Sequence, residues 1–308
     1  MRIVFAGTPA FSAKILSTLL TGPHTIVGVL SQPDKPKGRG QQLIPTPVKT
    51  LALEHQIPVF QPPTLKTAEA QKVIVDWQPD LMIVVAFGLL LPQAILDIPR
   101  LGCMNIHVSL LPRWRGSSPM QRALLAGDTQ TGITFMKMDA GMDTGPILSQ
   151  YVHPIQETET FLELEQHLCQ IAQQHLLKTI EDYAAGTLSP QTQSTSGVTL
   201  APKLSKEDGL LDLTRPAWLL AKQIAALNPW PGTYFEHQGQ KIKVIQAVAE
   251  TGEGAERRIL SYDAKGLQIG TSAGILRILQ IQLPNKPICT VAALKNGHPQ
   301  LFIPSTLI

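Results

Sequence analysis

The sequence has few cysteines, and their scarcity excludes two classes of small, cross-linked protein. Cys103, Cys169 and Cys289 are the only three in 308 residues, lie far apart and form no CxxC pair. A disulfide framework needs cysteines in even numbers, and a cysteine zinc site needs closely spaced pairs. We therefore expect neither feature, and we expect the protein to work in a reducing compartment.

Long hydrophobic runs are also missing. The longest apolar run, LMIVVAFGLLL at residues 81–91, is too short to cross a bilayer, which takes about 20 apolar residues. The first residues, MRIVFAGTPAF, lack the basic segment, the long apolar stretch and the cleavage site of a secretory signal. These absences predict a cytoplasmic protein without membrane contact.

Charge is sparse and unevenly divided. Charged residues make up 16% and hydrophobic residues 44% of the chain, which is typical of a folded globular protein. Residues 201–308 contain 12 Lys and Arg against 8 Asp and Glu, whereas residues 1–200 contain 14 against 15. A basic C-terminal part suits a polyanionic partner, although an ordinary solvated surface explains the same charge equally well.

Strand-like and helix-like segments alternate along the first half of the chain. Apolar strand-like segments occupy residues 2–7, 25–31, 80–88, 103–109 and 131–138, and helix-like segments occupy residues 9–20, 46–56, 67–78, 118–128 and 160–185. This alternation predicts an α/β fold with a doubly wound, mostly parallel sheet. In such sheets, ligands bind beyond the carboxyl ends of the strands.

The composition changes near residue 189. Residues 189–208 are rich in Ser, Thr and Pro and show no useful periodicity, so we expect a linker there. After a helix-like segment, short β-like runs follow at residues 241–250, 266–272 and 275–283, separated by glycine-containing turns. We therefore expect a first domain at 1–188 and, at 209–308, a small β-barrel or sandwich.

The segment NIHVSLLP carries the sharpest chemical signal. Asn105, His107 and Ser109 alternate with Ile106 and Val108 just before the chain leaves the predicted sheet. Successive strand side chains point to opposite faces, so an extended segment places all three polar groups on one side. Three such groups at a strand end indicate a reactive site.

A second loop supplies carboxylates. DAGMDTGP at residues 139–146 places two aspartates and two glycines after a predicted strand, and its glycines allow close approach to a neighbouring strand. Asp143 can orient His107 and stabilise its charged form, whereas an Asx turn alone explains Asp139. His107 and the two aspartates match no standard metal-ligand pattern, and no metal is expected.

Two other chemistries are disfavoured by local sequence. Ser109, His107 and Asp143 are the residue types of a hydrolase triad, but Ser109 has no GxSxG motif around it and precedes Leu-Leu-Pro. FAGTPAF at residues 5–11 follows a strand and opens a helix, yet it is neither GxGxxG nor a Walker A loop. It holds an anion or polar ligand on its backbone N–H groups, or it is simply a tight turn.

Basic residues gather in one loop of the first domain. Lys35, Lys37 and Arg39 alternate with Pro36, Gly38 and Gly40. Basic side chains on a glycine-containing loop can adapt to a phosphate backbone, and the alternative is a loop that only faces solvent.

These motifs together resemble a known family. NIHVSLLPRWRGSSP (105–119) and DAGMDTGP (139–146) are similar to the signature of enzymes that transfer a formyl group from 10-formyltetrahydrofolate. The basic loop, APKLSKEDG (201–209) and NPWPGT (228–233) resemble the branch of this family that acts on charged initiator methionyl-tRNA. The likeness extends over nearly the whole chain.

The resemblance implies a fold and partners. It implies a Rossmann-like catalytic domain at 1–188 and an OB-like β-barrel at 209–308 that holds tRNA. The implied co-substrate is 10-formyltetrahydrofolate, the implied partner is initiator methionyl-tRNA, and we expect a monomer. Val108 stands where a proline is common, but this departure removes no catalytic group.

The resemblance also implies roles for individual residues. The catalytic residues fall on Asn105, His107 and Asp143. The expected cofactor-binding residues are Phe87, Gly88, Leu89, Ser109, Leu110, Leu111, Pro112 and Asp139. The expected nucleic-acid contacts are Lys35, Lys37, Arg39, Lys49, Lys203 and Lys206, with Arg39 a principal contact to the acceptor stem.

Formyl transfer to an amine needs no enzyme nucleophile, because the substrate amine attacks. The Asn105 amide and a protonated His107 suit a developing oxyanion, and Asp143 can keep His107 charged and help to move protons. His107 serves equally well as the general base, and sequence leaves both roles open. Two alternatives also remain: a formyltransferase for a small amine or amino sugar, and a tRNA-binding module with a vestigial fold.

Overall fold

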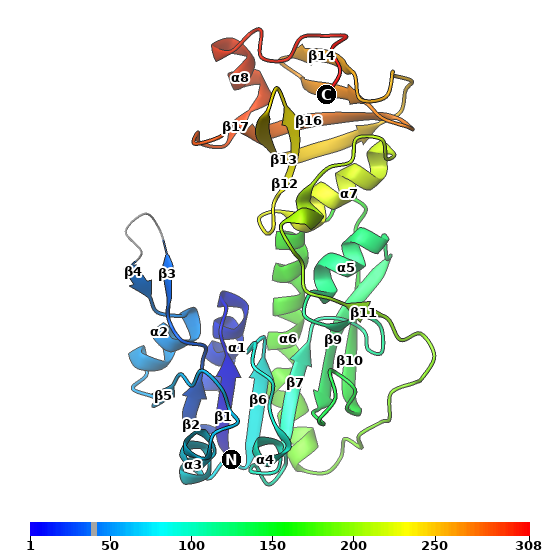
Figure 1. Cartoon of the computed structure of the whole chain (residues 1–308). Helices are drawn as coiled ribbons and strands as arrows, with labels where there is room; N and C mark the ends of the chain where they lie inside the picture. Colours follow the sequence, from blue (N-terminus) through cyan, green and yellow to red (C-terminus); the bar gives the residue numbers. More distant parts are fainter. Residues whose placement is uncertain (38–41) are drawn as a thin grey trace. The chain divides into compact units, whose positions relative to one another are not determined.

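The computed structural model describes residues 1–37 and 42–308 as two compact units (Figure 1). The first unit comprises Met1–Pro119, Gln130–Pro154 and Glu165–Ala201; the second comprises Met120–Thr129, Ile155–Leu164 and Pro202–Ile308. Among the helices of the described residues, none is long and apolar enough to cross a membrane.

The first unit contains a seven-stranded sheet in the order β10-β9-β7-β6-β1-β2-β5. Its strands are β1 (Arg2–Gly7), β2 (Thr25–Leu30), β5 (Val59–Phe60), β6 (Leu81–Val85), β7 (Cys103–His107), β9 (Gln130–Lys137) and β10 (Ile147–Pro154). The five neighbouring strands β7, β6, β1, β2 and β5 are parallel. β9 is antiparallel to β7, and β10 is antiparallel to β9. The predicted doubly wound, mostly parallel sheet is confirmed. Its order reverses between β1 and β6, so a ligand site is expected at their carboxyl ends.

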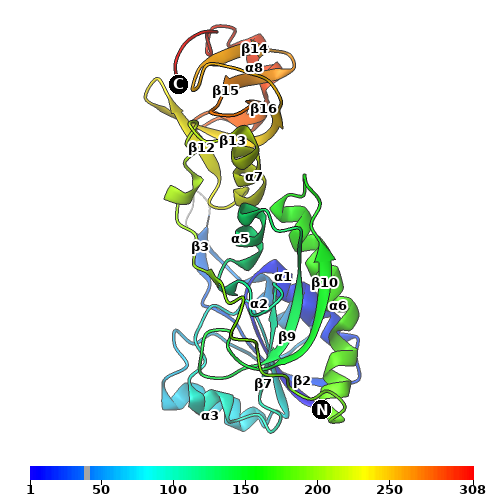
Figure 2. The ribbon, with the colours of Figure 1, turned by 90° about the vertical axis from the view of Figure 1, so that its right-hand side faces the viewer.

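Helices cover both faces of this sheet. They are α1 (Ala10–Leu20), α2 (Pro47–Glu54), α3 (Ala68–Trp77), α4 (Gln93–Leu96) and α6 (Phe161–Ala184). On one face, Val4 and Ala6 of β1 share a buried core with Ile74 of α3. Figure 2 shows α3 and α6 on opposite sides of the sheet. Buried apolar faces on both sides explain why the central strands read as nearly continuous apolar runs.

Side-chain hydrogen bonds join the loops at the carboxyl edge of this sheet. Thr8 Oγ1 donates to the Phe87 carbonyl (3.0 Å) and accepts from the Gln32 backbone N–H (3.3 Å). Ser12 Oγ donates to the Val85 carbonyl at 2.6 Å. The loops that follow β1, β2 and β6 are therefore held side by side.

The second unit is built on an antiparallel sheet in the order β12-β13-β16-β15-β14, with β17 paired to β16. Its elements are α5 (Pro119–Ala126), η1 (Glu207–Gly209), α7 (Ala217–Leu227), β12 (Thr233–His237), β13 (Gln240–Glu250), β14 (Ile259–Asp263), β15 (Gly266–Gly270), β16 (Ile275–Gln282), β17 (Cys289–Thr290) and α8 (Val291–Gly297). Phe235, Ile278 and Phe302 lie in its core. Within the described residues, β12 and β14 do not pair with each other, so closure into an OB-like barrel is not confirmed.

Two short ladders lie outside the main sheets. β3 (Lys35–Lys37) pairs with β4 (Gln42–Ile44), on either side of the part of the basic loop that lies outside the described residues. β11 (Leu200–Ala201), inside the segment expected to be a linker, pairs in parallel with β8 (Arg115–Gly116). The expected linker therefore makes ordered contacts with the first unit as far as Ala201.

The β9–β10 hairpin depends on a glycine. A Cβ at Gly132 of β9 would collide with the Tyr151 carbonyl oxygen of β10. We expect Gly132→Ala to lower the free energy of unfolding by about 1–3 kcal/mol in urea denaturation, because a backbone atom of a paired strand cannot move aside. Gly297→Ala is the control, since a Cβ there meets nothing within 4 Å. Equal losses in both variants would contradict the steric explanation.

Candidate active site

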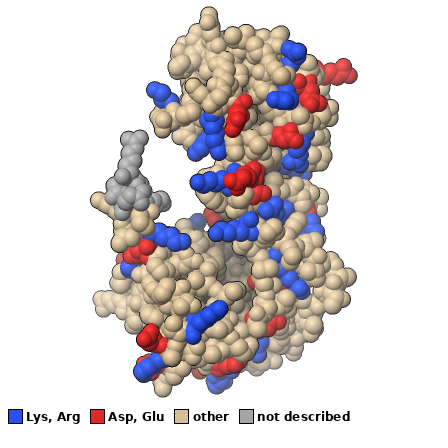
Figure 3. Space-filling view, viewed as in Figure 1, with Lys and Arg blue, Asp and Glu red and all other residues tan. Residues whose placement is uncertain are grey.

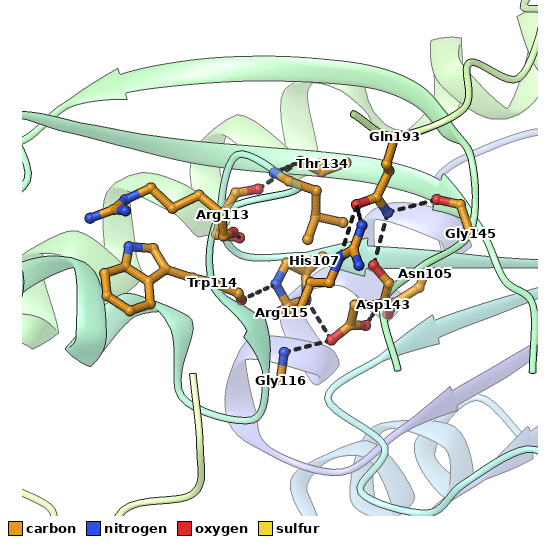
Figure 4. Close-up of polar contacts among 12 residues, drawn as sticks. Asn105, His107, Arg113, Trp114, Arg115, Gly116, Thr134, Asp143, Gly145 and Gln193 are labelled. Atoms are coloured by element: carbon orange, nitrogen blue, oxygen red, sulfur yellow. Dashed lines mark hydrogen bonds and ion pairs between the residues drawn. The ribbon is translucent and has the colours of Figure 1, made fainter. Parts of the chain in front are cut away.

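The candidate site lies at the carboxyl end of β7. This strand lies between β6 and β9, and its Asn105 and His107 side chains both point toward Asp143 (Figure 4). The expectation that Ser109 shares their strand face is wrong, because β7 ends at His107. Ser109 lies in the following turn, where its buried hydroxyl donates to the Arg113 carbonyl at 2.7 Å.

The His107 imidazole is buried, and its two nitrogens have different surroundings. Nε2 lies 2.9 Å from the Trp114 carbonyl oxygen. A carbonyl only accepts hydrogen bonds, so Nε2 carries a hydrogen in this arrangement. Nδ1 lies 3.7 Å from Asp143 Oδ2. Nδ1 is therefore the nitrogen that remains for proton transfer or for donation to a ligand.

The Asp143 carboxylate connects the site. Its Oδ2 accepts from the Gly116 N–H (2.8 Å), and its Oδ1 accepts from Asn105 Nδ2 (3.3 Å). Because a side-chain amide has two N–H groups and one contacts Asp143, the second N–H of Asn105 remains for a ligand. The arrangement thus aligns two possible donors, the Asn105 amide and the His107 ring, around one negative charge.

Gly116 can approach Asp143 only because it lacks a side chain. Its φ is +121°, and a Cβ would lie 2.6 Å from the Ala201 carbonyl oxygen. The backbone of β11 thus lies directly against the residue that donates to Asp143.

Sequence reasoning missed Gln193. This buried side chain donates from Nε2 to the carbonyls of Asp143 (2.8 Å) and Gly145 (2.7 Å). Its Oε1 accepts from Arg115 Nη2 (2.7 Å) and Nε (3.1 Å). A glutamine in a Ser/Thr/Pro-rich stretch carries no periodic or motif signal, so nothing in the local sequence distinguished it.

Thr134 of β9 forms hydrogen bonds with the turn that follows β7. The Thr134 hydroxyl donates to the Ser109 carbonyl (2.6 Å) and accepts from the Leu111 N–H (3.2 Å) and from Gln150 Nε2 (2.9 Å). Leu111 is buried, while Leu110 and Pro112 are half-buried. Thr134 therefore fixes the shape of the expected SLLP folate segment, and folate contact by these four residues stays a prediction.

The remaining expected cofactor residues differ in exposure. Phe87 is buried in the core, whereas Gly88 is exposed with φ +82° and Leu89 is half-buried. Asp139 Oδ1 accepts from the Gly141 N–H (3.0 Å) and from Thr144 Oγ1 (2.7 Å), which is the geometry of an Asx turn. A cofactor role for these residues also stays a prediction.

The expected nucleic-acid residues fall on different parts of the chain. Lys35 Nζ donates to Gln32 Oε1 at 3.1 Å, and Lys49 Nζ lies 2.5 Å from Asp34 Oδ2. A hydrogen bond from Gln61, and to a smaller extent one from Lys49, holds the pKa of Asp34 below its usual value. Asp34 therefore stays charged and offsets the charge of Lys49.

The other four nucleic-acid candidates are less defined. Lys37 ends β3, and Arg39 lies outside the described residues. Lys203 and Lys206 are exposed in the second unit, where basic side chains are interspersed with acidic ones on the face seen in Figure 3. Nucleic-acid contact by all six residues stays a prediction.

Comparison with known proteins identifies relatives along the whole chain. The family described as formyl transferase matches residues 1–180, and the one described as formyl transferase, C-terminal domain, matches residues 203–299. The methionyl-tRNA formyltransferase of Pseudomonas fluorescens strain SBW25 is 46% identical over 308 residues, covering 100% of this chain and 97% of the relative. Its counterpart from strain Pf-5 is 47% identical with the same coverage.

Solved structures share the fold. An N-formyltransferase from Helicobacter canadensis, in complex with folinic acid and dTDP-3-aminofucose, aligns with a TM-score of 0.65 at 15% identity. The alignment covers 90% of this chain and 98% of that chain. At this identity the likeness supports the fold alone.

Replacing Gly116 tests the packing around Asp143. We expect Gly116→Ala to lower the free energy of unfolding by about 2–4 kcal/mol, because it adds a clash with Ala201 to an unfavourable φ. Gly186→Ala is the matched control: its φ is +74°, but a Cβ there meets nothing within 4 Å. Chemical denaturation measures both. A Gly116→Ala loss no larger than the control loss would show that Ala201 does not crowd this position.

Proposed function

The chain belongs to the formyl transferase family, and we propose that it transfers the formyl group of 10-formyltetrahydrofolate to the α-amino group of methionine on charged initiator tRNA. The observation that carries this proposal is the identity of 46–47% over the full chain to two methionyl-tRNA formyltransferases. The arrangement of Asn105, His107 and Asp143 at the carboxyl edge of the sheet supports it chemically.

The carboxyl edge offers groups that suit a folate. Within the described residues, the backbone N–H groups of Phe87, Gly88 and Leu89 donate to no protein acceptor. A planar ring with hydrogen-bonding edges fits such backbone donors, and the turn 109–112 would help to hold it. When bound, 10-formyltetrahydrofolate supplies a formyl group on nitrogen, which an amine can attack.

Asn105 and His107 stabilise charge in the proposed reaction. Acyl transfer places negative charge on the formyl oxygen, and the free Asn105 N–H and a protonated His107 Nδ1 are suitable donors to it. The Asp143 carboxylate lies beside His107 Nδ1 and accepts a hydrogen bond from the Asn105 amide, so it orients both groups. The contact of His107 Nε2 with Trp114 fixes the ring, so that any proton exchange takes place at Nδ1.

The tRNA part of the proposal rests on dispersed basic residues. Lys35, Lys37, Arg39 and Lys49 would contact the acceptor stem, and Lys203 and Lys206 would contact the tRNA from the second unit. A net charge of +3 with a basic C-terminal part agrees with a polyanionic substrate. We further propose that the protein acts as a monomer in the cytoplasm.

The direct test is formylation of defined acceptors. The purified protein is incubated with 10-formyltetrahydrofolate and either methionyl initiator tRNA or small amines, including an amino sugar. We expect formyl-methionine on the tRNA and no product from the small amines. Formylation of an amino sugar alone would overturn the proposal in favour of a small-molecule formyltransferase, and no turnover at all would leave only a binding role.

Substitutions in the site separate the two roles open to His107. We expect Asn105→Ala and His107→Ala each to lower kcat by about 10²–10³-fold, the typical loss of one oxyanion donor. His107→Gln keeps an N–H donor but cannot act as a base. Steady-state kinetics with Met-tRNA decides: activity of His107→Gln well above that of His107→Ala indicates donation, and equal losses indicate general base catalysis.

The basic residues are tested by salt dependence. We expect Arg39→Ala, Lys203→Ala and Lys206→Ala each to weaken tRNA binding and to lower the slope of log Kd against log salt concentration by about 1, as for loss of one phosphate contact. Folate binding should not change. Lys72→Ala is the control, since Lys72 is exposed and pairs with Asp76 on α3. An effect of Arg39→Ala on folate affinity would contradict the loop assignment.

A further inference from the structure

We propose that Gln193 is a positioning residue for formyl transfer, because its side chain fixes the loop that carries Asp143. The inference rests on the proposed function, in which Asp143 orients Asn105 and His107. Gln193 itself contacts neither of these two side chains in the described hydrogen-bond network. It acts through the backbone of the Asp143 loop.

Gln193 is the only buried side chain among residues 189–200, all of which the structure describes. Both of its donated hydrogen bonds end on carbonyl oxygens, and both bonds that it accepts come from the Arg115 guanidinium (Figure 4). Only one orientation of the carboxamide satisfies these partners, since carbonyls accept and guanidinium donates. Both the amide nitrogen and the amide oxygen of Gln193 are therefore hydrogen-bonded, and the side chain links Arg115 to the loop 143–145.

The loop needs such a connector because Asp143 has an unfavourable backbone conformation. Its φ is +53°, in the left-handed region, which is uncommon for residues other than glycine although aspartate adopts it more readily than most. Such a conformation persists only where surrounding contacts hold it. Two donors on the carbonyls of Asp143 and Gly145 supply that restraint next to the carboxylate that Asn105 and Gly116 contact.

The same stretch of chain also holds the opposite side of His107. Thr199 Oγ1 accepts from the Trp114 N–H at 2.9 Å, and the Trp114 carbonyl lies 2.9 Å from His107 Nε2. Residues 193–201, which we call the strap, thus restrain the partner of each imidazole nitrogen: Asp143 beside Nδ1 and Trp114 beside Nε2. The strap therefore sets the position of the His107 ring relative to Asp143.

Gln193→Glu isolates the donor function. The carboxylate still accepts from Arg115 but cannot donate to Asp143 or Gly145. We expect kcat to fall by about 10–100-fold while KM for folate and for tRNA changes less than about threefold, as expected when reacting groups are misplaced without loss of binding. Gln191→Glu is the matched control: Gln191 is exposed, its side chain donates to the Ser189 carbonyl (3.2 Å), and the variant should keep wild-type kcat.

Nuclear magnetic resonance of the ligand-free protein gives a second measurement that does not depend on turnover. We expect the ¹⁵N signals of the His107 ring to shift in Gln193→Glu and in Thr199→Val, and to stay unchanged in Gln191→Glu. If Gln193→Glu does not fold, as judged by its thermal unfolding midpoint, Gln193→Met of nearly equal size takes its place.

The outcomes separate the two proposals. Unchanged kcat and unchanged His107 signals in a folded Gln193 variant would overturn the positioning role, as would a loss confined to KM. If the wild type does not formylate Met-tRNA, the proposed function fails, whereas the His107 signals still report whether Gln193 positions the ring. Shifted signals together with a fall in kcat would support both.

Discussion

The site depends on one carboxylate that is held by groups distant in sequence. Asp143 accepts from Gly116 and Asn105 and lies beside His107 Nδ1, so its placement sets the relative positions of both candidate donors. A buried or half-buried carboxylate is stable only when its oxygens are satisfied, and here a backbone N–H and an amide do this. The chemistry therefore requires the surrounding loops to be fixed before any substrate binds, which is the condition for electrostatic stabilisation without reorganisation.

The topology of the sheet explains how these groups meet. β7 is parallel to β6, so the carboxyl end of β7 lies at the same edge of the sheet as the turn after β6. β9 is antiparallel to β7 and runs past it from His107 toward Met104, and the loop after β9 carries Asp143. The loop that follows β9 brings Asp143 into contact with Asn105, which lies 38 residues earlier in the sequence.

Much of this arrangement could be predicted from the sequence, because its signals are local. Alternation of Asn105 and His107 with apolar residues marks a strand face, and a glycine-rich loop after the next strand identifies Asp143 as its partner. Ser109 was misplaced because the end of a strand depends on where the chain bonds next, here on the Arg113 carbonyl. Gln193 could not be found, since its contacts to Asp143 span 50 residues and depend on the path of the chain past β8. The ion pair of Lys49 with Asp34 likewise follows no sequence pattern that would have predicted it.

The surroundings of Ser109 and Cys103 do not suit either side chain to act as a nucleophile in covalent catalysis. The Ser109 hydroxyl is buried and donates its hydrogen to the Arg113 carbonyl, not to a side-chain base. Cys103, two residues before Asn105, is buried, and this burial raises the pKa of its thiol to about 12, so it is not a thiolate at neutral pH. An amine substrate brings its own nucleophile, and the protein then has only to place donors and remove a proton. The rate of the proposed reaction depends on alignment, and backbone groups of Gly116 and Trp114 contact the Asp143 and His107 side chains that have to be aligned.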